Sequence, residues 1–202
     1  MSQAPETLLP AEVDELQELT SVGCGQALSS LGRLMQKRLE MDVPETWAGR
    51  SPGAIADFLG ALGQDLVAVA VHLEGLLAGH LVLALPEGDA SRLAAALGYP
   101  VAAEGWTSMA ESALMESGNI VGSAFVSAVA QMVRQKLLLS VPRLARGGGR
   151  ECLDALVARE AGAMALATRF SCHEPPGPLE GLILFMPEPG KVRPLLEALE
   201  RD

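Results

Sequence analysis

The chain has 202 residues, with 15 lysines and arginines against 25 aspartates and glutamates, a formal net charge of −10 and an isoelectric point near 4.8. Such an acidic chain repels phosphate backbones, and it has no dense basic stripe, which argues against nucleic acid as a partner. Hydrophobic residues make up 49% of the chain and charged residues 20%, a composition that argues against disorder.

The cysteines, the N-terminal segment and the apolar runs indicate the cellular compartment in which the protein works. Cys24, Cys152 and Cys172 are an odd number without CxxC spacing, which is typical of a reducing compartment. The N-terminal segment is acidic and lacks the basic start of a signal peptide. The longest apolar runs, 66–71 and 76–85, are far shorter than the roughly 20 residues that cross a bilayer. We therefore expect a cytoplasmic protein without membrane contact and, with only three dispersed histidines, without a metal site.

The two halves of the chain repeat one pattern at an offset of 98 residues. Segment 13–44 aligns without gaps with segment 111–142, and Glu18 then lies opposite Glu116. Each segment is predicted to form a long helix that ends in a short run containing Val-Pro.

Both halves continue with the same order of shorter elements. A short helix is expected at 53–62 and again at 149–160. Strands are expected at 66–73, 76–85, 163–172 and 179–186, and an amphipathic helix closes each half at 86–97 and 187–199. The agreement of the whole element order indicates an internal duplication.

The duplication predicts an α+β fold with pseudo-twofold symmetry, in which about six largely antiparallel strands are covered by helices. Two of these helices are long and contain the motifs described below. No Pro- or Ser-rich linker separates the halves, so we expect one domain over residues 1–202, with repeats at about 10–100 and about 108–202. Because a duplicated chain closes its own pseudo-twofold, a monomer is favoured.

Three polar residues of the second repeat are candidates for chemistry. Ser112, Glu116 and Asn119 have the spacing i, i+4, i+7, which places them on one face of a helix. Gly118 and Asn119 are poor helix formers, and glycine costs about 1 kcal/mol relative to alanine. Three interpretations are open at this point: an ordinary solvated face, a close approach of another chain at the small residues, or a function for the carboxamide.

The second repeat contains the run Ser112-x3-Glu116-x2-Asn119, and Pro142 follows after a further 22 residues. This run resembles the signature of the CheC/CheX/FliY phosphatases of bacterial chemotaxis. The stretch GNIVGSAFVSAV and the later LSVP also resemble the Gly-Asn-rich helix and the Val-Pro strand of that family.

The first repeat contains a similar run, Asp14-x3-Glu18-x2-Ser21, and Pro44 again follows after 22 residues. The chain therefore resembles the two-repeat CheC more than the shorter CheX. The first run departs from the family at Ser21, where the family has asparagine. A hydroxyl is shorter than a carboxamide, so we expect a degenerate first site, in which Glu18 retains at most a docking role.

The resemblance implies hydrolysis of the aspartyl phosphate on a CheY-type receiver. In that family the glutamate, here Glu116, anchors the receiver through a receiver lysine, and the asparagine, here Asn119, orients the attacking water. Ser112 occupies the Asp/Ser position of the motif, and Pro142 is a structural mark. Phosphoryl transfer depends on positioning an in-line water more than on a strong base. The resemblance implies no cofactor on this chain, because the Mg²⁺ belongs to the receiver.

The same resemblance leaves other functions open. It implies a further partner, the receptor deamidase CheD, for which no residue of the sequence stands out. The alternative to an enzyme is a non-catalytic module that binds phosphorylated receivers, or a flagellar switch component, because FliM and FliY share the fold. The presence of Asn119 together with Glu116 favours the enzyme, since a pure scaffold has no need of the amide.

Overall fold

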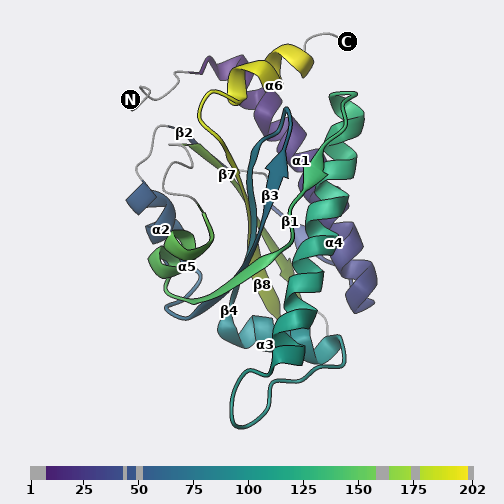
Figure 1. Cartoon of the computed structure of the whole chain (residues 1–202), viewed down its shortest axis with the longest axis vertical. Coiled ribbons are helices and arrows are strands. Elements are labelled where there is room, and N and C mark those ends of the chain that lie inside the picture. Colours follow the sequence, from purple (N-terminus) through teal and green to yellow (C-terminus); the bar gives the residue numbers. More distant parts are fainter. Residues whose placement is uncertain (1–7, 43–44, 49–51, 158–163, 174–177, 200–202) are drawn as a thin grey trace.

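One antiparallel sheet forms the centre of the molecule, and helices pack on both of its faces (Figure 1). The computed structural model describes residues 8–42, 45–48, 52–157, 164–173 and 178–199. The helices are α1 (Pro10–Met35), α2 (Pro52–Gly60), α3 (Glu87–Ala96), α4 (Ser108–Met132), α5 (Gly149–Leu156) and α6 (Val192–Leu199). The strands are β1 (Glu40–Met41), β2 (Glu45–Ala48), β3 (Leu66–Glu74), β4 (Gly79–Pro86), β5 (Leu138–Leu139), β6 (Arg143–Gly147), β7 (Met164–Cys172) and β8 (Leu179–Pro187).

The same order of elements occurs twice along the chain: a long helix, two short strands, a short helix, two long strands and a short helix. The burial pattern of the two long helices repeats as well. Each buried residue of α1 has a counterpart 98 positions later, in or next to α4, that is also buried or, at Ala130, half-buried. The predicted α+β fold with two long helices and antiparallel strands is therefore confirmed.

The two halves exchange their short strands. β1 and β2 of the first half pair with β7, whereas β5 and β6 of the second half pair with β3. At the centre β4 pairs with β8, with Leu83 opposite Ile183. Each half thus supplies the edge of the other half's hairpin, and both contribute to one continuous sheet.

The number of strands differs from the sequence prediction of about six. The described sheet has eight strands, which occupy six positions because β1 and β2 share one edge and β5 and β6 share the other. In the second half Pro142 lies between β5 and β6, and a proline has no N–H to donate to the ladder. The Val-Pro run is therefore divided into two short strands. Pro44, its counterpart, lies outside the described residues.

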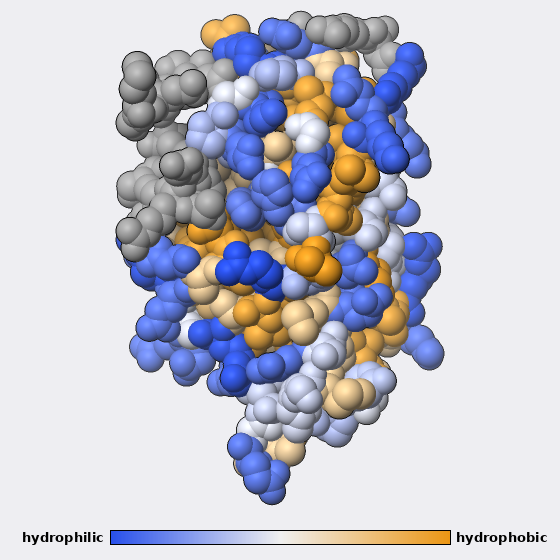
Figure 2. All heavy atoms as spheres, viewed as in Figure 1, coloured by the Kyte–Doolittle hydropathy of each residue, from blue (hydrophilic) through white to orange (hydrophobic). Residues whose placement is uncertain are grey.

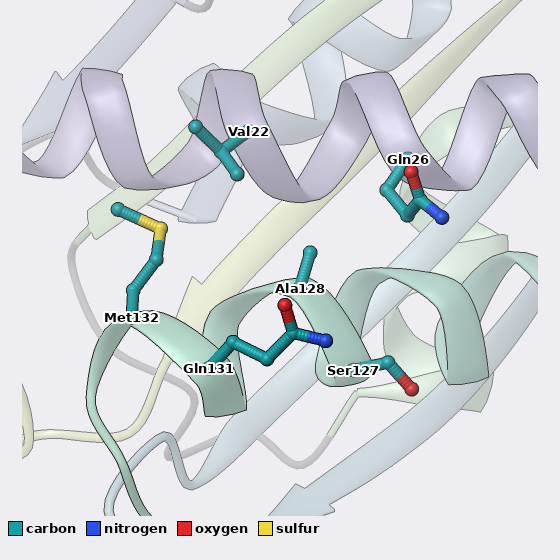
Figure 3. A pocket seen from close by; sticks show the side chains of 6 residues that line it. All are labelled: Val22, Gln26, Ser127, Ala128, Gln131 and Met132. Atoms are coloured by element: carbon teal, nitrogen blue, oxygen red, sulfur yellow. The ribbon is translucent and has the colours of Figure 1, made fainter.

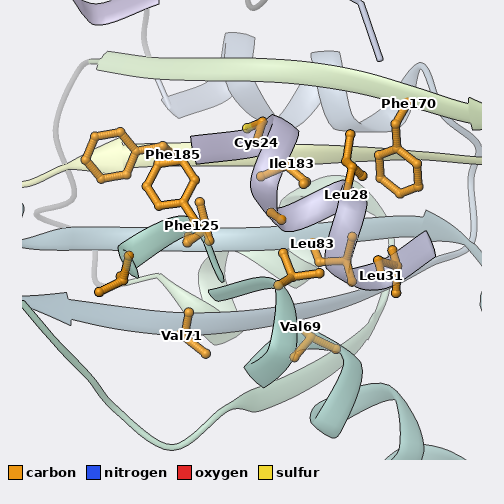
Figure 4. Packing of buried hydrophobic residues seen from close by; sticks show 14 of the residues in the cluster. Cys24, Leu28, Leu31, Val69, Val71, Leu83, Phe125, Phe170, Ile183 and Phe185 are labelled. Carbon is orange, nitrogen blue, oxygen red and sulfur yellow. The ribbon is translucent and has the colours of Figure 1, made fainter. Parts of the chain in front are cut away.

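Each face of the sheet has its own hydrophobic cluster, because successive side chains of a strand point to opposite faces. In β3, Val67, Val69 and Val71 point toward α1 and α4, whereas Ala68 and Ala70 point toward α2 and α5. Figure 4 shows the first of these clusters, where α1, α4 and the strands meet. The α1–α4 side contains the larger core, and it holds the two long helices in place.

The two long helices lie against each other and run in opposite directions (Figure 1). A groove of about 430 Å³ between them shows the direction, since Val22 of α1 faces Met132 of α4 while Gln26 faces Ser127 (Figure 3). Because the motif of each repeat lies in the first half of its helix, the two motif segments lie toward opposite ends of the helix pair.

The sheet edge formed by β5 and β6 presents both apolar side chains and the exposed arginines Arg143 and Arg146. Figure 2 shows hydrophobic and hydrophilic residues interspersed on this face between α5 and α4. The large apolar side chains exposed along this segment are Leu138, 51% exposed, and Val141, 83% exposed. Pro142 therefore belongs to an accessible edge of the sheet and not to the motif helix.

Among the described helices, α4 is the one long and apolar enough to cross a membrane by length and composition. The window that meets this criterion is 44% buried. The buried residues of α4 belong to the same core cluster as those of α1 and β3, as is typical of a core helix. The composition of α4 is therefore weak evidence for a membrane span.

Two glycines bring α4 close to strand β3. A Cβ atom at position 118 would overlap the side chain of Val69, and one at position 122 would lie 2.8 Å from Val71 Cγ2. Of the interpretations left open by the sequence, Gly118 thus serves a close approach, but the approaching segment is a strand of the same chain.

The contact predicts that Gly118→Ala destabilises the protein, by about 1–3 kcal/mol as is usual for overpacking of a core. Val69→Ala in the same chain should recover part of this loss by making room for the added methyl group. Urea denaturation measures both effects.

Gly88 in α3 provides the matched control, because a Cβ there meets only the far end of the Arg92 side chain, at 4.0 Å. Gly88→Ala should leave the free energy of unfolding unchanged or raise it by up to about 1 kcal/mol. If Gly118→Ala proved as harmless as this control, the close contact with β3 would be wrong.

Candidate functional site

The outer face of α4 presents the second-repeat motif to solvent. Ser112 and Glu116 are exposed and Asn119 is half-buried, whereas the intervening Ser117 and Gly118 are buried against the sheet. The structure therefore brings the three motif side chains to one face. The packing of the opposite face leaves them pointing away from the core.

The polar side chains of Glu116 and Asn119 on this face have no partner within the part of the chain that the structure describes. Neither the carboxylate of Glu116 nor the carboxamide of Asn119 has a hydrogen bond or an ion pair to a described residue. Buried polar residues of the same helices, by contrast, bond to their own backbone: Ser117 Oγ donates to Ala113 O at 2.9 Å, and Thr20 Oγ1 to Leu16 O at 2.7 Å. The carboxylate and the carboxamide of the motif are thus available to a partner molecule.

The start of α4 is fixed by a cap and by a contact with strand β6. Thr107 Oγ1 accepts a hydrogen bond from the Ala110 amide at 3.2 Å, as an N-cap residue does. Arg146 of β6 pairs with Glu111 at 3.3 Å, and its guanidinium lies 5.8 Å from the centre of the Trp106 ring. Sequence reasoning missed Arg146, which is separated from the motif along the chain and follows no spacing rule.

The first-repeat motif has a similar placement on α1. Asp14 and Glu18 are exposed and Ser21 is half-buried, and none of the three side chains has a hydrogen bond or an ion pair to a described residue. This face therefore offers a carboxylate in the same arrangement as α4 but a hydroxyl in place of the carboxamide. Pro44 of this motif lies outside the described residues.

The described residues offer little besides these faces for covalent or metal chemistry. They contain no group of three or more His, Cys, Asp or Glu side chains arranged to hold a metal ion. Cys24 is fully buried, and burial raises the pKa of its thiol to about 12. The thiol therefore stays protonated at neutral pH and is not a nucleophile.

The fold is that of chemotaxis and flagellar switch proteins. The structure matches that of Thermotoga maritima FliY with a TM-score of 0.70 and 15% identity, over 97% of this chain and 99% of that one. The FliM middle domain from H. pylori matches with a TM-score of 0.63, at 10% identity over 95% of this chain and 99% of that one. CheX in the CheX–CheY–BeF₃–Mg²⁺ complex from Borrelia burgdorferi matches with a TM-score of 0.52, at 22% identity over 82% of this chain and 96% of that one.

Sequence comparisons point to one family within this class. The model of the CheC-like family matches residues 109–146, a segment that contains the second-repeat motif. The CheY-P phosphatase CheC of Bacillus subtilis is 26% identical over 137 residues, which are 66% of this chain and 65% of that relative. The chain thus covers slightly less than two thirds of the length of this curated relative. Together with the fold, these matches support the CheC/CheX/FliY family, and the resemblance predicted from the motifs is confirmed.

The exposure of the motif predicts how its residues affect stability. Because their side chains have no described partner, Glu116→Ala and Asn119→Ala should leave the free energy of unfolding within about 0.5 kcal/mol of wild type. Asn119→Ala should even raise it slightly, since alanine is the better helix former. Urea denaturation checks this, and a loss of more than about 1 kcal/mol would show instead that the side chain has a structural role.

Proposed function

We propose that this protein is a phosphatase that accelerates hydrolysis of the aspartyl phosphate on a CheY-type receiver, acting through the outer face of α4. The observation behind the proposal is the pair Glu116 and Asn119, a carboxylate and a carboxamide without described partners on one helix face. The chain belongs with chemotaxis phosphatases by sequence, and the similarity to a protein named CheY-P phosphatase supports this substrate class.

The two side chains have complementary roles in this proposal. Glu116 accepts a hydrogen bond from a lysine of the receiver and so sets the position of α4 over the phosphorylated aspartate. Asn119 follows one turn later, about 4.5 Å further along the helix axis. Its amide oxygen and N–H₂ group hold a water molecule in line with the phosphorus atom, as the asparagine does in the family that the chain resembles.

The chemistry demands little else from this chain. In phosphoryl transfer the attacking water needs orientation more than deprotonation, so a neutral amide accelerates the step by positioning. No covalent intermediate on this chain is required. We propose that the Mg²⁺ needed to neutralise the phosphoryl oxygens belongs to the receiver. Ser112 and Pro142 then support the motif without contacting the reacting atoms.

Catalysis at the first-repeat face is proposed to be weak or absent. Ser21 presents a hydroxyl where the second repeat presents a carboxamide, and it does not reach as far from the helix. Glu18 is exposed and keeps a docking function. Since the two motif segments lie toward opposite ends of an antiparallel helix pair, a receiver docked on α1 leaves the face of α4 accessible.

A non-catalytic binding or switch module is the second candidate function. It is favoured by the likeness of the fold to FliY and to the FliM middle domain over nearly the whole chain. We rank it second because it gives no role to the amide of Asn119. A cytoplasmic location and a monomeric state are further proposals that follow from the sequence and its duplication, and a contact with CheD is one that follows from the family resemblance.

The proposal predicts that wild-type protein accelerates dephosphorylation of its cognate receiver and that Asn119→Ala removes the acceleration, because the water is no longer oriented. Loss of one such interaction is expected to cost on the order of 100-fold or more in rate. Decay of the phosphorylated receiver measures the effect. Binding without acceleration by wild type would instead support the second candidate function.

Ser21→Asn tests whether the first face is a decayed copy of the second. If it is, introducing the carboxamide in an Asn119→Ala background should restore measurable dephosphorylation, since Glu18 is already in place. Ser29→Asn, which changes an exposed serine further along α1, is the matched control and should restore nothing. Equal rates for both variants would show that the first repeat lacks more than the amide.

A further inference from the structure

The outer face of α4 is acidic and has no positive charge of its own. Residues 108–132 contain no lysine or arginine, and they contain the carboxylates of Glu111 and Glu116. The whole chain has a net charge of −10. A partner that brings a phosphoryl group to this face therefore meets repulsion unless a nearby cation compensates.

Arg146 of β6 lies at the border of this face. Its Nη2 atom is 3.3 Å from Glu111 Oε1, which places the guanidinium beside the first turns of α4. Glu111 precedes Glu116 by five residues, about 7.5 Å along the axis. At about 100° per residue, Glu111 is separated by about 80° from Asn119 and by about 140° from Glu116. Arg146 thus lies beside the first turns of α4, on the angular side nearer Asn119, which is about 12 Å further along the axis than Glu111.

The arginine is held in place and yet remains accessible. Its guanidinium lies over the Trp106 ring at 5.8 Å, within range of a cation–π interaction, and Trp106 Nε1 donates to Glu87 Oε1 at 2.8 Å. The side chain of Arg146 is still 44% exposed. A positive charge that is already oriented loses less conformational entropy on contact with a partner than a free surface lysine does.

Stability alone gives a weak reason for this arrangement. An exposed pair such as Arg146–Glu111 contributes only about 0–1 kcal/mol to folding. Thr107 already caps the helix at this end. The ordered, half-exposed guanidinium of Arg146 is therefore able to contact an anionic partner as well.

We infer that Arg146 is a receiver-docking residue, which contacts acidic or phosphoryl groups of the receiver and sets the affinity of the α4 face for it. The inference rests on the proposed function and extends it, because it assigns the partner's electrostatic recognition to a residue outside the motif. Arg146 does not orient the attacking water, so its removal weakens docking and leaves the rate of the bound complex unchanged.

The test uses the full chain and the cognate receiver activated with beryllofluoride and Mg²⁺. Arg146→Gln should raise the dissociation constant about tenfold at low ionic strength, and the increase should shrink at high salt as the charges are screened. In the phosphatase assay the same variant should raise KM with kcat within about twofold of wild type. Arg146→Lys should lie between wild type and Arg146→Gln, since it keeps the charge but loses the guanidinium that lies over the Trp106 ring.

Arg150→Gln is the matched control, because Arg150 is an exposed arginine on α5, which packs on the opposite face of the sheet. It should bind the receiver as wild type does. Wild-type affinity of Arg146→Gln at low salt, or a loss of kcat with unchanged KM, would overturn the inference. Failure of wild type to accelerate dephosphorylation refutes the proposed function alone, since the binding measurements still decide on Arg146; failure of wild type to bind refutes both.

Discussion

The close contact between α4 and strand β3 determines which residues of α4 face solvent. Gly118 and Gly122 lack the side chains that would collide with Val69 and Val71, so one side of the helix is pressed onto the sheet. The position after Gly118 is then directed outward. Glycine at position 118 is thus explained by the close packing of α4 on the sheet. The packing does not require asparagine at position 119, and the proposed function supplies a reason for it.

The exchange of short strands sets the second constraint. Because β5 and β6 pair with β3 and not with their own hairpin, the second half places Arg146 next to the start of its own long helix while completing the sheet of the first half. The same exchange in reverse puts β1 and β2 on β7. The long helices consequently lie antiparallel over one sheet, with an amide-bearing face toward one end and a serine-bearing face toward the other.

Much of this arrangement could be predicted from local sequence patterns. The periodicity of apolar residues indicates both long helices, and the spacing of Ser112, Glu116 and Asn119 correctly predicts a shared face. The Val-Pro run is divided into two short strands at Pro142. The sequence prediction treated this run as a single strand, although the missing N–H of a proline is evident from the sequence. The exchange of strands and the contact of Arg146 with Trp106 and Glu111 could not be predicted, because pairing between distant segments is decided by the packing of the whole sheet.

The central claim is that the carboxamide of Asn119 orients the attacking water while docking depends on other groups. The rate constant for dephosphorylation of the receiver at a saturating concentration of Asn119→Asp tests it most directly, because this change keeps the size of the side chain and removes its N–H₂ donor. The account predicts that the bound receiver then loses its phosphate no faster than the receiver alone. A saturating rate equal to that of wild type would contradict the account.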